Sequence, residues 1–200
     1  MRVARMHIAC SAGLLVCVSG CAGTLRPASA LAPQRDPARA AALSGQALAL
    51  LSESRFAESA ALLEQALRSD PFCGVAYNNL GIAQLRLEKP FEAAHSFQNA
   101  ARLLPRSSAP RANLGLLLER AGDFESAEEN FRAALRDSPD DIQIVGYLAR
   151  LHARQNRHTP ETRSWLQIVA AQENDPAWRS WAQKELSRQP AVHTEQGSSP

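Results

Sequence analysis

Residues 74–107 read GVAYNNLGIAQLRLEKPFEAAHSFQNAARLLPRS, and residues 108–141 read SAPRANLGLLLERAGDFESAEENFRAALRDSPDD. The two stretches carry the same residue at several positions 34 apart: Asn79 and Asn113, Leu80 and Leu114, Gly81 and Gly115, Ala93 and Ala127, Phe97 and Phe131, Ala100 and Ala134. The prolines Pro71, Pro105 and Pro139 keep the same interval. A fixed period of this length is typical of a repeat array. The sequence therefore predicts stacked repeats and largely excludes an enzyme.

Apolar residues around these stretches follow helical spacing, as in Leu43, Ala47 and Leu50, and no alternating strand pattern occurs. We expect helices near 38–52, 55–69, 74–87, 90–103, 108–121, 124–137, 141–155, 160–172 and 176–188.

The residues between these segments are typical of helix ends. Gly122 is expected to end one helix and Asp123 to cap the next, and Asp140 with Gln143 is expected to form a capping box. Further helix starts are marked by prolines and by caps before them: Pro90, Thr159 with Pro160, and Asp175 with Pro176.

At these residues the chain resembles the tetratricopeptide repeat, whose pattern has an aromatic residue, Leu-Gly, an alanine with an aromatic four residues later, and a closing proline. The matches in 74–107 are Tyr77, Leu80, Gly81, Ala93, Phe97, Ala100 and Pro105. The matches in 108–141 are Leu114, Gly115, Gly122, Phe124, Ala127, Phe131, Ala134 and Pro139. The resemblance implies an all-α superhelical solenoid of antiparallel helix pairs.

Two flanking repeats fit this pattern less well. In 40–73 the matches are Phe56, Leu63, Ala66 and Pro71, while Ala47 replaces Gly and Ser59 replaces Ala. In 142–175 the matches are Leu148, Ala149 and Trp165, while Glu161 stands where Ala is usual. The segment 176–188 resembles the helix that caps such arrays. We therefore expect about four repeats and a capping helix over 38–188.

The N-terminus has the pattern of an export signal. Arg2 and Arg5 precede an uncharged run, 8–18, which is shorter than the ~20 apolar residues that span a bilayer. Residues 18–21, Val-Ser-Gly-Cys, resemble a bacterial lipobox, which implies removal of 1–20 and lipidation of Cys21. The alternative is an ordinary signal followed by an unrelated cysteine. Within the lipoprotein resemblance, Ala22 favours the outer membrane, with the protein facing the periplasm.

The other segments are interpreted from composition and charge. Residues 21–37, rich in Pro and Ala, are expected to be a flexible tether, and 189–200 a disordered tail. Residues 1–20 hold two of the 22 basic residues and none of the 20 acidic ones, so removing them leaves a formal net charge of zero. Nucleic-acid binding, which needs a basic excess, is therefore not expected.

No pattern for catalysis, a metal, a cofactor or a small-molecule substrate is present. His152 and His158 do not share a helical face, and phosphate loops and nucleophile elbows are lacking. Glu128 and Glu129 are expected on solvated helix faces. Cys73, the single cysteine left after processing, is either an inert thiol or half of an intermolecular disulfide.

The resemblance also implies where a partner binds, because the first helix of each pair lines the concave surface in this family. Carried onto this sequence, the partner-binding positions are Asn78, Asn79, Ile82, Arg86, Asn113, Leu116, Arg120, Tyr147, Arg150 and Arg154, with Ser44 and Leu48 in the first repeat. The side chains of Asn79 and Asn113 are expected to form hydrogen bonds with the backbone of a bound peptide. Ile82 and Leu116 either take apolar side chains of the partner or pack helix on helix.

Two further clusters leave alternatives open. Arg150, Arg154 and Arg157 form a stripe that is either a solvated face or a contact for an acidic partner. Trp178 and Trp181 either cover the end of the core or form a docking patch.

The resemblance thus predicts a non-catalytic adaptor for a protein or peptide partner, anchored to the outer membrane through Cys21. It is similar to the tetratricopeptide lipoproteins of pilus biogenesis, namely type IV pilotins and tight-adherence (Flp) assembly lipoproteins. This implies assistance in building an envelope machine such as a pilus or secretion system. The alternatives are a component of outer-membrane protein assembly and an accessory subunit of a cell-wall enzyme.

Overall fold

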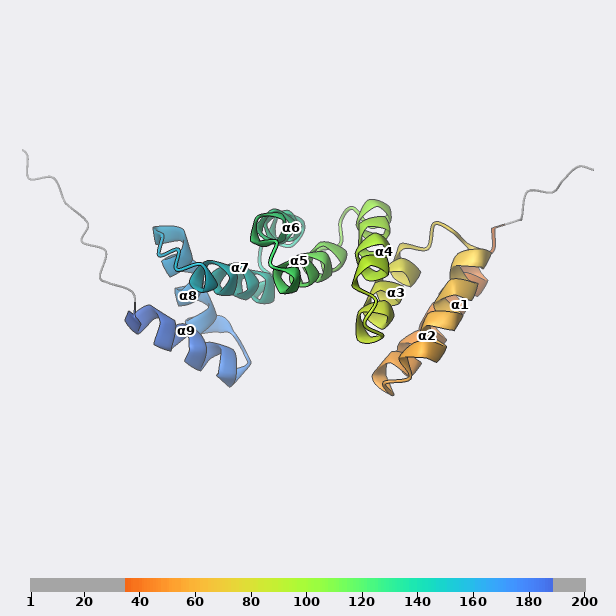
Figure 1. Cartoon of the computed structure of the whole chain (residues 1–200), viewed down its shortest axis with the longest axis horizontal. Helices are drawn as coiled ribbons and strands as arrows, with labels where there is room; N and C mark the ends of the chain where they lie inside the picture. Colours follow the sequence, from red (N-terminus) through yellow and green to blue (C-terminus); the bar gives the residue numbers. More distant parts are fainter. Residues whose placement is uncertain (1–34, 189–200) are drawn as a thin grey trace, which may run out of the picture. The chain divides into compact units, whose positions relative to one another are not determined.

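The computed structural model describes residues 35–188, and all of the regular elements in this range are α-helices (Figure 1). The helices are α1 (Pro37–Ser52), α2 (Phe56–Ser69), α3 (Gly74–Arg86), α4 (Pro90–Leu103), α5 (Ala109–Ala121), α6 (Phe124–Asp137), α7 (Ile142–Arg154), α8 (Pro160–Gln172) and α9 (Pro176–Arg188). The expected signal 1–20, Cys21, most of the expected tether and the tail 189–200 lie outside the described residues. None of the helices within 35–188 is long and apolar enough to cross a membrane.

Each helix packs against the next one along the chain, and the first helices of successive pairs also contact one another. These additional contacts join α1 to α3, α3 to α5 and α5 to α7. This is the contact pattern of a repeat array, in which each repeat touches only its neighbours. The prediction of an all-α solenoid of helix pairs is confirmed.

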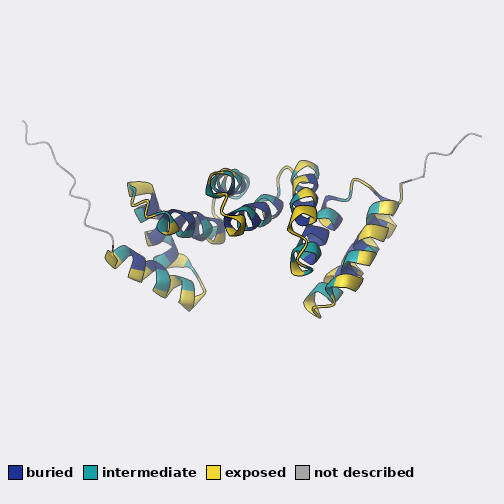
Figure 2. Cartoon of the chain, in the orientation of Figure 1, coloured by how far each residue is buried: buried dark blue, intermediate teal, exposed yellow. Residues whose placement is uncertain are grey.

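Most of the buried apolar residues fall into three clusters, and each cluster bridges neighbouring repeats. Figure 2 shows the buried residues of the helices in dark blue. Leu63 and Ala66 of the first repeat pack with Leu80 of the second, for example. Phe97 of the second repeat packs with Leu114 of the third. A helix pair therefore buries its apolar face only when the next pair is stacked on it.

The repeated spacing of glycine and phenylalanine within 74–141 has a steric cause. A Cβ atom on Gly81 would lie 2.6 Å from Cε1 of Phe97, and a Cβ on Gly115 would lie 2.6 Å from Cε1 of Phe131. Both rings are fully buried. The second helix of each pair thus places its ring where the first helix has no side chain.

In the first repeat the buried Leu63 stands in place of the phenylalanine, and a hydrogen bond also joins the two helices. Ala47 stands in place of the glycine and Ser59 in place of an alanine, and both are fully buried. The Ser59 hydroxyl donates to the carbonyl oxygen of Ala47 at 2.8 Å. The polar group that this departure from the repeat pattern buries is therefore satisfied.

The fourth repeat also compensates for its departures. Trp165 takes the place of the phenylalanine and is 7% exposed. Glu161, at the usual alanine position, accepts two hydrogen bonds from Arg132 of the preceding repeat, at 2.8 and 2.9 Å. This pair is half exposed, so we expect it to contribute only a few tenths of a kcal/mol to about 1 kcal/mol.

Most predicted helix ends are confirmed. Asp123 and Thr159 cap α6 and α8 through their side chains, and Asp175 accepts from the Ala177 N–H at the start of α9. The capping box predicted at Asp140 is wrong, because the cap of α7 is Asp141, whose side chain accepts from the N–H groups of the second and third helical residues. In a run of two aspartates, only the backbone conformation decides which of them is the cap.

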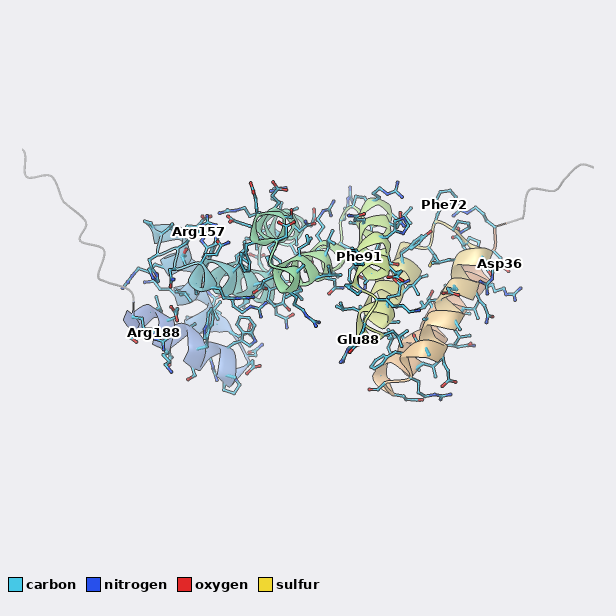
Figure 3. All side chains as sticks on the ribbon, in the orientation of Figure 1. Asp36, Phe72, Glu88, Phe91, Arg157 and Arg188 are labelled. Carbon is cyan, nitrogen blue, oxygen red and sulfur yellow. The ribbon has the colours of Figure 1, made fainter. Side chains whose placement is uncertain are left out.

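The turn within each pair contains one residue with positive φ, and these residues recur every 34 positions. They are Ser54 (φ 60°), Glu88 (φ 60°), Gly122 (φ 84°) and Asn156 (φ 53°). Glu88 is labelled in Figure 3. Such a left-handed residue ends a helix and frees the chain to turn back, and glycine adopts it at the lowest cost.

The helical domain begins slightly before the expected residue 38. Pro37 is the first residue of α1, and the Asp36 side chain accepts from the Arg39 N–H at 2.9 Å. Arg35 donates to Asp70 at the end of α2 at 2.8 Å, and its guanidinium lies over the Phe72 ring. Residues 35 and 36, assigned to the tether from composition, are therefore tied to the first repeat.

Candidate functional site

The first helices α3, α5 and α7 contact one another in turn, and the residues expected to bind a partner lie along them on what the family resemblance makes the concave surface. We call this surface the first-helix face. It comprises the ten residues expected to bind a partner: Asn78, Asn79, Ile82 and Arg86 on α3, Asn113, Leu116 and Arg120 on α5, and Tyr147, Arg150 and Arg154 on α7.

The asparagines of this face form a hydrogen-bonded row. The Asn113 side chain donates to Asn78 Oδ1 at 3.0 Å, which joins α5 to α3, and Asn78 Nδ2 donates to Asn79 Oδ1 at 3.4 Å. Asn79 is only 8% exposed, whereas Asn78 and Asn113 are partly exposed. Because an amide has two donors and two acceptor positions, Asn78 and Asn113 keep unused hydrogen-bonding capacity toward solvent.

The apolar positions of the face have mixed roles. Ile82 and Leu116 are partly buried and pack against core clusters, so both positions pack helix on helix. In the first repeat, Leu48 is 56% exposed, while Ser44 is buried and donates to the Ala40 carbonyl at 2.8 Å. Arg86 is exposed and lies over the Phe56 ring at 5.1 Å.

The two arginines of α7 are both held by one buried carboxylate, that of Glu119 on α5. Arg150 donates to Glu119 Oε1 at 3.2 Å and to Oε2 at 2.6 Å, and Arg154 donates to Oε1 at 2.8 Å. The Glu119 side chain is 3% exposed, against 32% for Arg150 and 50% for Arg154. This part of the arginine stripe is therefore an ion-paired junction between repeats three and four.

An aromatic group continues the face from α7 onto α9. The Arg150 guanidinium lies over Tyr147 at 5.4 Å and over Trp178 at 5.3 Å, while Trp178 meets Trp181 edge to face at 5.5 Å. Both tryptophans are partly buried and pack against the C-terminal core cluster. Burial raises the pKa of Tyr147, and the nearby Arg150 partly offsets this rise.

Two cavities open along the same helices. One, of about 380 Å³, lies between the α3–α4 turn and the end of α5, and is lined by Leu85, Glu88, Pro90, Leu117, Arg120 and Ala121. The other, of about 200 Å³, is lined by Arg150, Ala177, Trp178 and Trp181. Each cavity thus includes one arginine of the first-helix face.

The expectation that Glu128 is solvated is wrong, although Glu129 is exposed as expected. The Glu128 side chain is 16% exposed and accepts from Arg132 and from Arg157, the latter labelled in Figure 3. Burial alone would raise the pKa of Glu128, but hydrogen bonds from Arg157, Arg132 and His152 together lower it to about 2. The third arginine of the stripe is therefore also ion-paired within the chain.

His152 belongs to the cluster of side chains around Glu128 and not to the first-helix face. Its ring is 1% exposed, with Nδ1 2.8 Å from Thr162 Oγ1 and Nε2 3.2 Å from Glu128 Oε1. Burial lowers the pKa of His152, and Glu128 partly offsets this. Within 35–188, no three His, Cys, Asp or Glu side chains are grouped as metal ligands.

Sequence reasoning missed Glu119, which organises the C-terminal half of the face. A signal was present, because the matching positions of the neighbouring repeats hold Leu85 and Ala153. A carboxylate at a position that is otherwise apolar predicts a buried ion pair, since a lone buried charge is costly. Its partners Arg150 and Arg154 on α7 were noted as a stripe of arginines, but their pairing with Glu119 was not predicted.

Several known proteins are similar to this chain in sequence or in fold. Tetratricopeptide repeat protein 16 of Macaca fascicularis is 30% identical over 110 residues, which are 52% of this chain but only 12% of that relative. YrrB, described as a TPR protein with an unusual peptide-binding site, has a TM-score of 0.61 and 21% identity over 74% of this chain and 76% of its own. PilF of Pseudomonas aeruginosa has a TM-score of 0.64 and 18% identity over 74% of this chain and 68% of its own.

These two structural likenesses, at low identity, concern the fold alone. The family itself rests on sequence: the tetratricopeptide repeat matches residues 44–112 and 112–176, which together span most of the helical domain. The chain belongs to the tetratricopeptide repeat family.

Proposed function

We propose that this protein is a non-catalytic adaptor whose first-helix face binds a peptide or a domain of a partner protein. The observation that carries the proposal is the succession of α3, α5 and α7, which contact one another in turn along the array. These helices carry side-chain amides and exposed guanidinium groups, and two cavities are each lined in part by one of their arginines. Amides pair with the N–H and C=O groups of a peptide backbone, and arginines add charge-assisted hydrogen bonds.

The similarity to YrrB supports this proposal, because that protein shares the fold and is described as having a peptide-binding site. The family is also one of interaction modules rather than of enzymes. The partner then binds across repeats, so that its affinity depends on the stacking of the array as well as on single contacts.

The finer part of the proposal concerns location and pathway. We propose that Cys21 carries lipid, that the protein is anchored at the periplasmic face of the outer membrane, and that it assists assembly of a pilus or a secretion system. The support is the sequence at 18–21 and the resemblance to pilus-biogenesis lipoproteins. A single acyl chain anchors a protein only weakly, so a stable anchor needs the several chains that such lipidation supplies.

The binding surface is tested by comparing two asparagine variants. The double variant Asn78→Ala with Asn113→Ala removes the exposed amides of the face, and Asn130→Ala is the control, because it removes an amide on α6 that only bonds the carbonyl of Ser126. We expect weaker capture of the partner crosslinked from membranes for the double variant only, at about 0.5–1.5 kcal/mol per lost contact. Circular dichroism establishes that both variants are folded. Equal capture by both would refute the assignment.

The anchor is tested separately with Cys21→Ser. Metabolic labelling with a palmitate analogue should label the wild-type chain and not the variant, which should also leave the membrane fraction. Label that persists on the variant would refute lipidation of Cys21 without bearing on the binding surface.

A further inference from the structure

The 200 Å³ cavity at the junction of α7 and α9 has apolar walls and one charged edge. Trp178 and Trp181 meet edge to face, and Ala177 completes the wall. Arg150 forms the charged edge, with its guanidinium stacked over Trp178 at 5.3 Å. The volume accommodates a single large apolar side chain of a ligand.

The charged edge carries an uncompensated positive charge. Arg150 and Arg154 share the single carboxylate of Glu119, which is 3% exposed and already accepts three hydrogen bonds. Within residues 35–188, Nη1 of Arg150 and Nη2 of Arg154 make no hydrogen bond. Both guanidiniums therefore hold N–H groups for a further acceptor, and a carboxylate satisfies them best because it also balances the charge.

The carboxylates nearest to this edge do not fill that role. Glu173 and Asp175 line the adjoining 80 Å³ cavity together with Tyr147 and Trp178, and among the described residues neither carboxylate forms an ion pair with Arg150 or Arg154. Their oxygens accept from backbone N–H groups, including that of Ala177, at the start of α9. A ligand carboxylate placed there would meet like charges, so we expect it beside Arg150 and Arg154, which share the carboxylate of Glu119.

We propose that this cavity is a binding site for an acidic peptide, in which a large apolar side chain enters between Trp178 and Trp181 while a neighbouring Asp or Glu pairs with Arg150 and Arg154. The site deepens the proposed function of the first-helix face and rests on it. Charge complementarity selects an acidic segment, and Glu119 fixes both guanidiniums in advance, which reduces the ordering cost of binding. The arginine stripe of α7 thus has both a structural and a recognition role.

The test uses blocked synthetic hexapeptides with an Asp-Phe pair at the centre, and matched peptides with Asn-Phe, Asp-Ala and Lys-Phe. Binding is followed by the intrinsic fluorescence of the tryptophans and by anisotropy of a labelled peptide. We expect the Asp-Phe peptide to bind at least tenfold more tightly than the other three. The preference for Asp over Asn should weaken at 0.5 M salt, because partly exposed charges are screened.

Three variants assign the preference to the site. Arg154→Gln should abolish the preference for Asp over Asn, and Trp181→Ala should abolish the preference for Phe over Ala. Arg136→Gln, an exposed arginine on α6, should change neither. Because Trp181 is partly buried, circular dichroism and thermal unfolding must show that Trp181→Ala is folded. If Trp181→Ala is unfolded, the Arg154→Gln result alone decides the assignment.

The site would be overturned if Asp-Phe and Asn-Phe peptides bound equally, if none bound, or if the preferences persisted in Arg154→Gln. Failure of the site is distinguishable from failure of the adaptor function. If Asn78→Ala with Asn113→Ala still reduced capture of the membrane partner, the first-helix face would bind that partner without using this cavity.

Discussion

At the scale of single residues, the close contact of two helices depends on glycine, because it has no side chain. Gly115 faces the buried ring of Phe131 so closely that any Cβ would overlap it, whereas Gly45 on α1 has no atom within 4 Å of an added Cβ. The two glycines therefore separate the steric effect of a methyl group from its effect on helix propensity.

We predict that Gly115→Ala lowers the free energy of unfolding by about 1–3 kcal/mol, because the buried ring must shift. Gly45→Ala should raise it by about 0.5–1 kcal/mol, because alanine loses less backbone entropy than glycine in a helix. Urea denaturation of both variants measures the difference. Stabilisation by both substitutions would contradict the packing of Phe131 on Gly115.

The second prediction concerns His152, whose folded-state pKa lies below its unfolded-state value of about 6.5 because of burial. As the pH falls below about 6.5, the unfolded chain binds a proton that the folded chain resists. The stability associated with His152 is thus fully present at neutral pH and is lost as the pH falls toward the folded-state pKa.

Unfolding free energies of wild type and His152→Gln, measured between pH 7.5 and 5.5, test this prediction. Glu128, with a pKa of about 2, stays ionised throughout this window, so it does not confuse the comparison. The wild type should lose stability with a slope of at most about 1.4 kcal/mol per pH unit, and the variant should lose less. Identical slopes would show that His152 is not the titrating group.

At the scale of elements, the turns within helix pairs depend on one left-handed residue each. Only Gly122 of the four such residues is a glycine, while Glu88 is an exposed residue with φ of 60°. We predict that Glu88→Gly raises the free energy of unfolding by about 1 kcal/mol, because an L-residue in this conformation costs about 1–2 kcal/mol. Gly122→Ala should lower it by a similar amount. Thermal unfolding measures both, and a loss of stability in Glu88→Gly would contradict the turn geometry.

The elements themselves were the most predictable level of the structure. The observed helices begin and end within one residue of the expected ranges, because a 34-residue period fixes every helix relative to the prolines and glycines between them. The cap of α7 was predicted at Asp140 instead of Asp141, because both adjacent aspartates can cap a helix. Local backbone geometry, which the repeat pattern does not encode, selects between them.

At the scale of the whole molecule, the family resemblance assigns the partner to the first helices, which stays a prediction, and it gives no sign of the ion pairs between repeats three and four. The Asn78–Asn113 bond joins positions 35 apart, one repeat plus one residue, and so follows the period. Glu119 pairs with arginines 31 and 35 residues away, and such contacts depend on the relative rotation of neighbouring repeats. A repeat period gives the order of the helices along the array, but it does not give the rotamers that meet between them.

The central claim is that the first-helix face receives the partner protein, and site-specific photocrosslinking tests it most directly. A benzoylphenylalanine residue is placed at position 120 on α5, within the face, or at position 136 on α6, outside it. Both positions carry exposed arginines that form no ion pair within 35–188, so the replacements are matched. The account predicts a crosslinked partner from position 120 and none from position 136. Crosslinks from position 136, with none from position 120, would place the partner on the second helices and contradict the account.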